Sequence, residues 1–521
     1  MALKRLRSHQ GCFGRFFCVN IDRVTAPLIS LPPVPRRPGA AEPMASMPAG
    51  SPRYSRRDLL SRVGGGFGLV ALAGLLGQRG NASGVSPLLA SDRAANPFAV
   101  QAPHFAPRAK RIIFLYMPGG PSHVDLFDPK PRLIRDNGKP LPFEKPKLER
   151  TKTGNLLASP WTFAPRGQSG IEVSELLPRI AGHIDDLCIV RSMVADNINH
   201  TGAALQLCTG EQAFSRPSLG SWLTYGLGTE NQNLPGFVVV SPAAVFQGAQ
   251  LWASSFLPSA YQGTLIRDLA NPIANLKIDS DTIQSQRVKL DVLGELNRLH
   301  RADRANASAL EARIASFELA FRMQRDAPEA FDLAQESAAT HRLYGTDQPT
   351  TQLFGKQCLL ARRLMERGVR FVQLFDAPEN NAWDHHGNLR ERLPARCAAV
   401  DQPIAALLTD LKASGLLDDT LVLWGGEFGR TPTAEGTNGR EHHPFGFTMW
   451  MAGGGIRGGM TFGATDEFGW HSVQDKVHVH DLHATLLHLM GFDHEKLTFR
   501  HGGRDYRLTD VHGRVVRELF A

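Results

Sequence analysis

A carboxylate, a guanidinium group and two imidazoles lie close together in residues 420–447. Glu427 and Arg430 come directly after a short apolar run, where a parallel strand is expected to end, and His442 and His443 precede the next apolar run. The carboxyl end of a strand in an open parallel sheet faces the ligand crevice. A carboxylate and a histidine on neighbouring loops can therefore hold a metal ion. The alternative is structural, with Glu427 paired to an arginine and the histidines serving as polar loop residues.

The tetrad Trp383-Asp384-His385-His386 is a second group of metal-binding residue types, and it follows another apolar run. In an extended loop, residues two apart face the same way, so Asp384 and His386 can converge on one ion while His385 faces the other side. Mixed imidazole and carboxylate donors favour Zn²⁺ or Mn²⁺ over Ca²⁺ or Mg²⁺, which prefer oxygen donors.

A third group follows the apolar run 112–117 and a Gly-Gly-Pro turn. It contains His123, Asp125 and Asp128. The alternative interpretation is a turn built from residue types that favour turns. Because three expected strand ends each supply acidic or imidazole groups, we predict a metal site. We expect Asp384, His386, Glu427 and one of two adjacent histidines, 442 or 443, to converge there.

Strand and helix patterns alternate along the body of the chain. Apolar runs predict strands at 112–117, 187–190, 237–240, 369–375, 421–424 and 448–452, and the first run, which is continuous and without polar alternation, is typical of a buried parallel strand. Amphipathic helices are predicted between them, and this order implies a mostly parallel α/β sheet covered by helices. Residues 280–345 have a helical composition with no strand pattern, which predicts a helical insertion in a domain spanning 108–521.

The net charge of +8 belongs to the N-terminal region. Residues 1–57 contain 10 Lys and Arg against 2 Asp and Glu, so the rest of the chain is neutral. This distribution excludes a nucleic-acid partner for the main body. The six cysteines form no C-x-x-C pair, and the chain has no P-loop and no G-x-S-x-G element. Zinc ribbons, nucleotide cofactors and an α/β-hydrolase mechanism are therefore not expected.

The N-terminal region predicts export. Residues 1–54 are expected to be a disordered leader, with Met44 and Met47 as alternative starts, and residues 55–90 a signal and linker. Arg56 and Arg57 precede an apolar run of 14 residues, which resembles a twin-arginine signal. We expect the twin-arginine machinery to deliver the protein to the periplasm or the extracellular space. A membrane-anchored helix is the alternative.

Ten motifs in the same order resemble the exported bacterial family called domain of unknown function 1501. They are SRRDLL, GGPSHVDLFDPKP, NHTGAALQLCTG, RPSLGSW, ARRLMERGVRFVQLF, WDHHGN, GEFGRTP, GREHHPF, GGGIRGG and GATDEFG. The resemblance covers nearly all of the chain after Ser55. It groups the chain with the alkaline-phosphatase-like superfamily, which includes sulfatases. It implies a three-layer α/β/α sandwich with a mostly parallel central sheet, and metal-assisted chemistry at phosphate or sulfate esters.

The resemblance also assigns roles to residues. Asp384 and His386 resemble an aspartate and histidine on one metal, and Glu427 stands where an acidic ligand follows a core strand. The later histidine ligand resembles His442 or His443. The acidic ligand after the first strand resembles Asp125.

The nucleophile position in this resemblance falls at His200, with Thr201 beside it. Two departures from the superfamily pattern matter. Phe428 replaces a histidine after Glu427, which argues against a full two-metal centre, and no formylglycine motif is present, which argues against typical sulfatase activity.

Two hypotheses follow. The first is an exported metallohydrolase acting on small-molecule or polysaccharide esters of phosphate or sulfate, with Thr201 or a water molecule on the metal as nucleophile and Arg430 stabilising developing charge. The second is a non-catalytic, metal-stabilised protein of the same fold that binds carbohydrates or anions.

Overall fold

The computed structural model describes residues 96–145, 152–272, 282–302 and 308–521. They all belong to one structural unit, Asn81–Ala521. The predicted leader and twin-arginine signal lie outside the described residues. Among the helices that the structure describes, none has the length and apolar character needed to cross a membrane.

The central sheet is built around β1 (Arg111–Tyr116). This strand lies between β7 (Phe371–Phe375) and β8 (Thr420–Gly425) and is parallel to both. All three strands are almost entirely buried, which agrees with their continuous apolar sequences. Because the three strands run in the same direction, their carboxyl ends lie at one edge of the sheet, as predicted.

The remaining strands make this a nine-stranded, mostly parallel sheet. β11 is antiparallel to its two neighbours, β4 and β8, and the other pairs in the sheet are parallel. The further strands of the sheet are β4 (Leu187–Val194), β5 (Phe237–Val240), β6 (Thr264–Ile266), β11 (Phe447–Ala452), β12 (Met460–Phe462) and β15 (Val477–His478).

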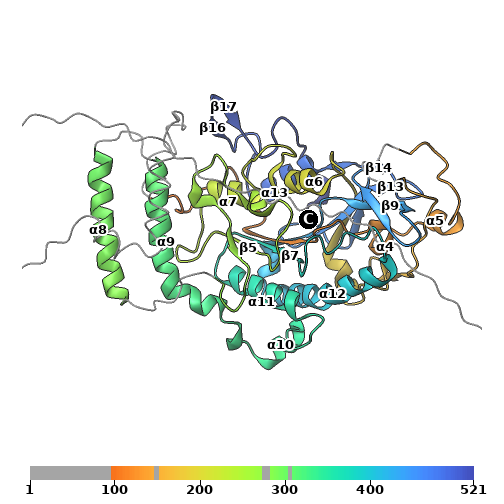
Figure 1. Cartoon of the computed structure of the whole chain (residues 1–521), viewed down its shortest axis with the longest axis horizontal. Helices are drawn as coiled ribbons and strands as arrows, with labels where there is room; N and C mark the ends of the chain where they lie inside the picture. The colour runs from red at the N-terminus through yellow and green to blue at the C-terminus, as the bar shows by residue number, and fades with distance from the viewer. Residues whose placement is uncertain (1–95, 146–151, 273–281, 303–307) are drawn as a thin grey trace, which may run out of the picture. The chain divides into compact units, whose positions relative to one another are not determined.

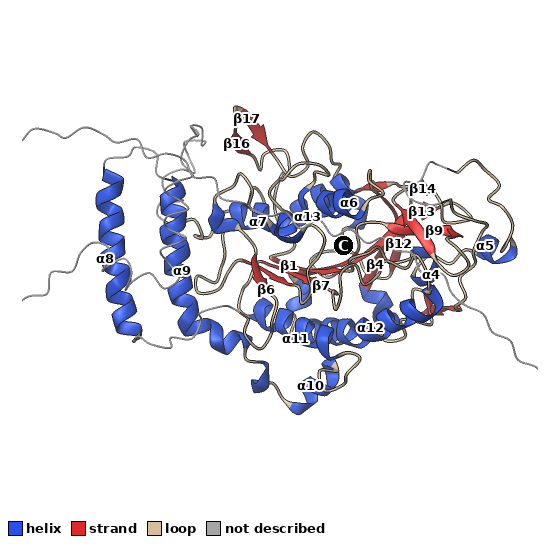
Figure 2. Cartoon of the chain, viewed as in Figure 1, coloured by secondary structure: helices blue, strands red, loops and turns tan. Residues whose placement is uncertain are grey.

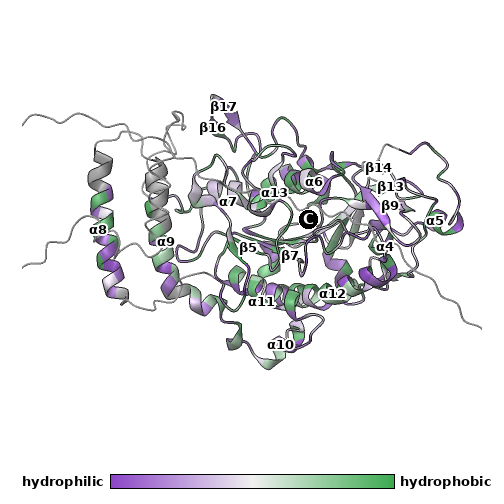
Figure 3. Cartoon of the chain, viewed as in Figure 1, coloured by the Kyte–Doolittle hydropathy of each residue, from purple (hydrophilic) through white to green (hydrophobic). Residues whose placement is uncertain are grey.

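Helices cover both faces of the sheet, as Figures 1 and 2 show. One face packs against α11 (Gln352–Glu366) and α12 (Leu389–Ala413). The other packs against α6 (His200–Thr209), α7 (Leu219–Leu227) and α13 (Val479–Leu489). Figure 3 shows hydrophobic and hydrophilic stretches alternating along α12, as expected for a helix with one face on a core.

Alternate residues of β1 enter two separate hydrophobic cores. Ile113 and Leu115 lie in the core shared with α11 and α12. Ile112 and Phe114 lie in the core shared with α6 and α13. This separation follows from the two-residue period of a strand. The fold is therefore the three-layer α/β/α sandwich that was predicted.

The described residues of the predicted insertion are helical and contain no strand. They form α8 (Ile283–Ala302), α9 (Ser308–Phe331) and α10 (Ala338–Tyr344). The end of α9 packs onto α11, where the buried Arg363 donates a hydrogen bond from Nε to the carbonyl of Ala330.

A hairpin between β8 and β11 brings polar residues into the interior. It consists of β9 (Gly429–Ala434) and β10 (Arg440–His443), which pair in an antiparallel arrangement. Except for Ala434, the residues of its two strands are buried, although Figure 3 shows β9 as hydrophilic. Buried polar side chains need partners, so the hairpin must exchange hydrogen bonds with the strand ends around it.

Shorter elements complete the described part of the fold. They are α4 (His123–Leu126), α5 (Pro131–Arg135), β2 (Phe163–Arg166), β3 (Ile171–Ser174), β13 (Ala464–Thr465), β14 (Ser472–Gln474), β16 (Phe499–His501) and β17 (Arg504–Tyr506).

Candidate metal centre

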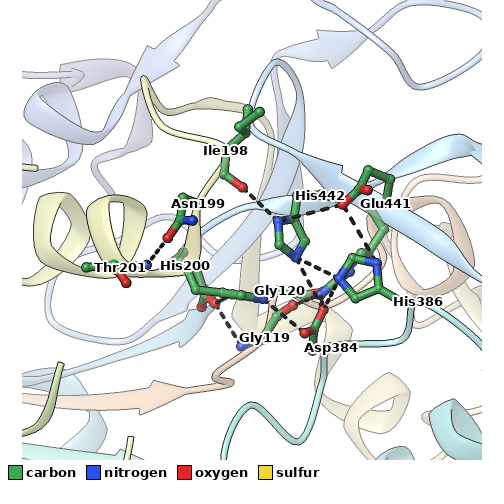
Figure 4. Close-up of polar contacts among 12 residues, drawn as sticks. Gly119, Gly120, Ile198, Asn199, His200, Thr201, Asp384, His386, Glu441 and His442 are labelled. Carbon is green, nitrogen blue, oxygen red and sulfur yellow. Dashed lines mark hydrogen bonds and ion pairs between the residues drawn. The ribbon is translucent and has the colours of Figure 1, made fainter. Parts of the chain in front are cut away.

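Four side chains converge at the carboxyl edge of the central sheet, as Figure 4 shows: His200, Asp384, His386 and His442. They come from the start of α6, from the loop after β7 and from β10. One donor atom of each lies within 4.8 Å of the others. We call these four residues the His₃Asp cluster.

The distances within the His₃Asp cluster are short. Asp384 Oδ1 lies 3.0 Å from His386 Nε2 and 3.3 Å from His442 Nε2, and Asp384 Oδ2 lies 3.1 Å from His200 Nε2. The Nε2 atoms of His386 and His442 are 3.0 Å apart. Donors around a tetrahedral Zn²⁺ with bonds of about 2.05 Å lie roughly 3.3 Å from one another. The spacing of the cluster is therefore close to that of a four-ligand metal site.

Hydrogen bonds fix the protons of all three imidazoles. Each ring has its Nδ1 atom beside an oxygen that can only accept: Glu427 for His200 at 2.7 Å, Glu435 for His386, and the carbonyl of Ile198 for His442 at 2.7 Å. The Nδ1 atoms must therefore carry protons, so that in the neutral rings the three Nε2 atoms would be the ones able to bind a metal ion. Imidazoles that bind metals have this arrangement, with the second nitrogen donating to a carboxylate or carbonyl.

The buried Nε2 atom of His200 has no hydrogen-bond partner in the described part of the chain, although it lies near Asp384. If both rings are neutral with protons on Nδ1, the Nε2 atoms of His386 and His442 face each other as lone pairs 3.0 Å apart, which is unfavourable unless a proton or a cation lies between them. A cation removes both problems because it accepts lone pairs. The donor set therefore fits a divalent metal that takes nitrogen and oxygen ligands.

Glu427, which was predicted to be a ligand, is not one of the four donors and instead contacts the cluster through Nδ1 of His200. Besides His200, it accepts hydrogen bonds from the backbone N–H of Gly119 at 2.9 Å and from the hydroxyl of Tyr116 at 3.1 Å. It is almost completely buried. Its role in this geometry is to orient His200, and it ties α6 to the end of β1.

Arg430 also holds a cluster residue in place. Its guanidinium group lies 2.5 Å from Asp384 Oδ1 and donates to the carbonyls of Gly119, Gly120 and Arg440. Only 1% of its side chain is exposed. With these contacts Arg430 orients Asp384. The sequence instead predicted that Arg430 would stabilise charge developing on a substrate.

Electrostatics make the cluster attractive to cations. Burial opposes ionisation of Asp384, but the charge of Arg430 and the three neighbouring imidazoles outweigh it and hold the pKa of Asp384 far below its usual range. Burial also opposes protonation of His200, yet the neighbouring carboxylates of Asp384 and Glu427 raise its pKa. Burial, reinforced by Arg430 and His200, lowers the pKa of His442 to about 4. A metal ion would compete with protons for these nitrogens.

Besides Glu427, two further residues predicted as ligands lie outside the cluster. His443 points away from His442, as neighbours in a strand must, and its Nε2 lies 2.5 Å from the carbonyl of Trp470. Asp125 forms a two-point ion pair with Arg440, with contacts of 2.7 and 3.0 Å, and neither side chain is exposed.

Thr201, predicted as a nucleophile, is exposed on α6 beside His200, and Figure 4 shows its backbone contact with Asn199. His200 itself faces the cluster as a donor. Sequence reasoning missed Glu435 and Glu441, which lie near His386, and the carbonyl of Ile198. Their only signal was proximity in sequence to the predicted ligands.

A family model described as "Protein of unknown function (DUF1501)" matches residues 109–520. The chain belongs to this family. The match confirms the resemblance drawn from the motifs. A search of curated proteins found none similar to this DUF1501 member in sequence.

Solved structures similar to this DUF1501 member include three enzymes. The lipoteichoic acid synthase LtaP from Listeria monocytogenes has 9% identity and a TM-score of 0.34, covering 77% of this chain and 78% of its own. The phosphonate monoester hydrolase from Silicibacter pomeroyi has 10% identity and a TM-score of 0.34, covering 66% and 71%. The alkaline phosphatase from the Antarctic bacterium TAB5 has 9% identity and a TM-score of 0.29, covering 67% and 92%. These likenesses are low, and the layer architecture rests on the sheet and helices themselves.

The Asp125→Asn variant is expected to lose stability while keeping metal affinity. Removing one partner of a buried ion pair leaves Arg440 uncompensated, which costs about 3–5 kcal/mol. Chemical denaturation measures this loss. Glu467→Gln, which breaks an exposed pair with Arg132, is the matched control and should cost at most about 1 kcal/mol. Metal loss without a change in stability would instead make Asp125 a ligand.

The Gly439→Ala variant is expected to disturb the loop that carries His386. A Cβ atom at Gly439 would lie 1.8 Å from the carbonyl oxygen of His386, so the backbone must move. We expect metal affinity to fall by about 10- to 100-fold, as when groups that orient ligands are lost. Competition with a chromogenic chelator measures it. The control is Gly387→Ala, where a Cβ atom meets nothing within 4 Å, and equal affinities of the two variants would contradict this positioning.

Asp376, which follows β7, should make stability depend on pH. Burial raises its pKa to about 6 from the ordinary 3.8. Above the ordinary value the unfolded carboxyl ionises first, so stability falls from about pH 4 to pH 6, by roughly 3 kcal/mol in total. The Asp376→Asn variant removes this penalty while Trp383 Nε1 keeps an acceptor in place of the 2.8 Å bond to Asp376. Its stability relative to the parent should rise between pH 4 and pH 7, and denaturant titrations that show a constant difference would refute this.

Proposed function

We propose that the protein is an exported, metal-dependent hydrolase of phosphate or sulfate esters, acting on a small molecule or a polysaccharide. The observation that carries the proposal is the convergence of three imidazole nitrogens and one carboxylate, with donor atoms within 4.8 Å of one another. His200, Asp384, His386 and His442 would hold one ion, with Zn²⁺ or Mn²⁺ favoured by the donor types. The ion would supply Lewis acidity toward a non-bridging ester oxygen.

The chain's own residues prepare the cluster for this role. Glu427 and Glu435 retain protons on the far nitrogens of two imidazoles, so that the near nitrogens stay free to donate. Arg430 fixes the orientation of Asp384. Such fixed dipoles and charges need not reorganise during a reaction, and this preorganisation is a major source of catalysis.

The approach to the cluster lies on the side of Asp384 and His386. Their side chains are 19% and 27% exposed, whereas those of His200 and His442 are 7% and 4% exposed. An ester group entering from solvent would therefore meet Asp384 and His386 first. Because His200 and His442 are buried, an ion held by these residues would be reached from the side of Asp384 and His386.

Water is the nucleophile that this geometry favours. In the described residues, no hydrogen bond joins the hydroxyl of Thr201 to the His₃Asp cluster, and Thr201 is exposed. The position assigned to a nucleophile by resemblance is taken by His200, which is committed to Glu427 and Asp384. A direct attack by water needs no covalent intermediate on the chain.

The His₃Asp cluster also supports the second candidate function, a non-catalytic protein that binds anions or carbohydrates around a structural ion. Phe428 packs against His442 with ring centroids 4.6 Å apart, at the position where the superfamily pattern has another imidazole. A single ion and no side-chain nucleophile would suffice for binding alone.

The proposed hydrolase is tested by removing metals with a chelator and restoring them singly. Zn²⁺ or Mn²⁺ is expected to restore hydrolysis of p-nitrophenyl phosphate or sulfate, and Ca²⁺ is not. The His386→Ala variant loses a donor, so metal affinity and activity should fall by at least about 10- to 100-fold. The control His471→Ala, and Thr201→Ala, should stay close to the parent.

Elemental analysis separates the outcomes of this test. Bound metal without turnover of any ester would favour the binding protein. Equal metal in the parent and in His386→Ala would contradict the His₃Asp cluster as the site.

A further inference from the structure

Another group of metal-binding residue types lies outside the His₃Asp cluster. Asp196 belongs to the connection between β4 and α6, and His478 and His480 stand at the start of α13. One candidate donor atom of each lies within 4.8 Å of the other two. Neither the family resemblance nor the proposed hydrolysis uses these residues.

The group faces a cavity of about 440 Å³. The cavity is lined by Asp196, His478, His480, Asp481, His512 and Gly513. Three imidazoles and two carboxylates in one cavity form a donor set typical of sites for borderline divalent metals. The volume leaves room for an ion with water or a small ligand beside it.

His480 is the residue that hydrogen bonding explains least. It is 6% exposed, and its Nδ1 atom is buried with no hydrogen-bond partner in the described part of the chain. Buried polar atoms without partners are rare, and an ion is one reason for them. The ring of His512 stacks on His480 with centroids 5.0 Å apart, which places a further imidazole beside the group.

The other two residues of the group, His478 and Asp196, are joined by a hydrogen bond. His478 Nδ1 accepts a hydrogen bond from the backbone N–H of His480 at 3.2 Å, so its Nε2 carries the proton and donates to Asp196 at 3.0 Å. An ion at Nε2 requires this proton to move to Nδ1, which ends the Nδ1 cap of α13. The N-terminus of α13 would keep one capping interaction, because the side chain of Asp481 accepts a hydrogen bond from the backbone N–H of His478 at 3.0 Å.

We propose that Asp196, His478 and His480 bind a second divalent metal ion, of the class that takes imidazole with carboxylate, such as Zn²⁺, Co²⁺ or Ni²⁺. The site stands apart from the proposed hydrolase function and needs no substrate. It would tie the connection that leads to His200 to α13. The backbone N–H of Asp196 already donates to Gln206 of α6 at 3.0 Å, so the ion would add a third element to an existing contact.

Co²⁺ titration followed by visible absorption tests the second site. The background is a double variant, His386→Ala with His442→Ala, which removes two donors of the His₃Asp cluster. It is expected to bind about one equivalent of Co²⁺. Adding His478→Asn should weaken that binding by at least about 10-fold, because asparagine caps a helix as well as any residue but supplies no imidazole.

The matched control is His501→Asn in the same background, since His501 is exposed on β16 and outside the cavity. It should leave Co²⁺ affinity unchanged. If His478→Asn does not fold by circular dichroism, Asp196→Asn replaces it and should show the same loss. A background variant that binds no Co²⁺, or that binds it equally with and without the His478 or Asp196 change, overturns the second site.

The number of bound metal equivalents distinguishes failure of the second site from failure of the His₃Asp cluster. If the parent binds one equivalent that is lost only in the His386 and His442 variants, the second site is refuted and the first stands. If the one equivalent is lost only with His478→Asn, the second site is supported and the His₃Asp cluster is not. Two equivalents, each lost with its own variant, support both.

Discussion

The buried guanidinium group of Arg430 joins the strand ends on which the candidate site depends. It binds the carbonyls after β1, the carboxylate of Asp384 after β7 and the carbonyl of Arg440 on β10. A buried cation with one partner missing costs several kcal/mol, so these segments hold one another in register. Gly119 permits the contact, because its φ of +114° and its missing Cβ let the β1 loop lie against the backbone of Asp384.

The sequence could predict the parts of the site that depend on the two-residue alternation of side chains along an extended backbone. Asp384 and His386 are two residues apart and do converge, as predicted. The choice between His442 and His443 required the register of β10, because adjacent residues of a strand face opposite sides and the sequence alone does not say which side faces Asp384. The glycine-rich sequence before β10 favoured a loop, and so the choice stayed open.

The parts that could not be predicted depend on contacts between distant residues. Asp125 is a structural partner because Arg440, 315 residues away, fills the same buried space. His200 is a donor because Glu427, 227 residues away, holds its Nδ1 proton. A list of residue types after strands does not reveal which carboxylates meet arginine and which meet imidazole.

The fold followed more directly, because parallel strands, buried on both faces, have continuous apolar sequences. The direction of β11 was not predicted. Parallel neighbours need a crossover of a dozen or more residues, usually a helix, and the segment between β8 and β11 forms the β9–β10 hairpin instead. The chain therefore returns antiparallel and delivers His442 to the carboxyl edge on its way.

The four donors of the His₃Asp cluster are spread from residue 200 to residue 442. Closing loops of this length costs entropy, and contacts so distant in sequence form late in folding. No fragment of the chain that ends before β10 can present all four donors. Acquisition of an ion would therefore report that nearly the whole sheet has assembled, and the choice of metal would be made in whichever compartment the chain completes its folding.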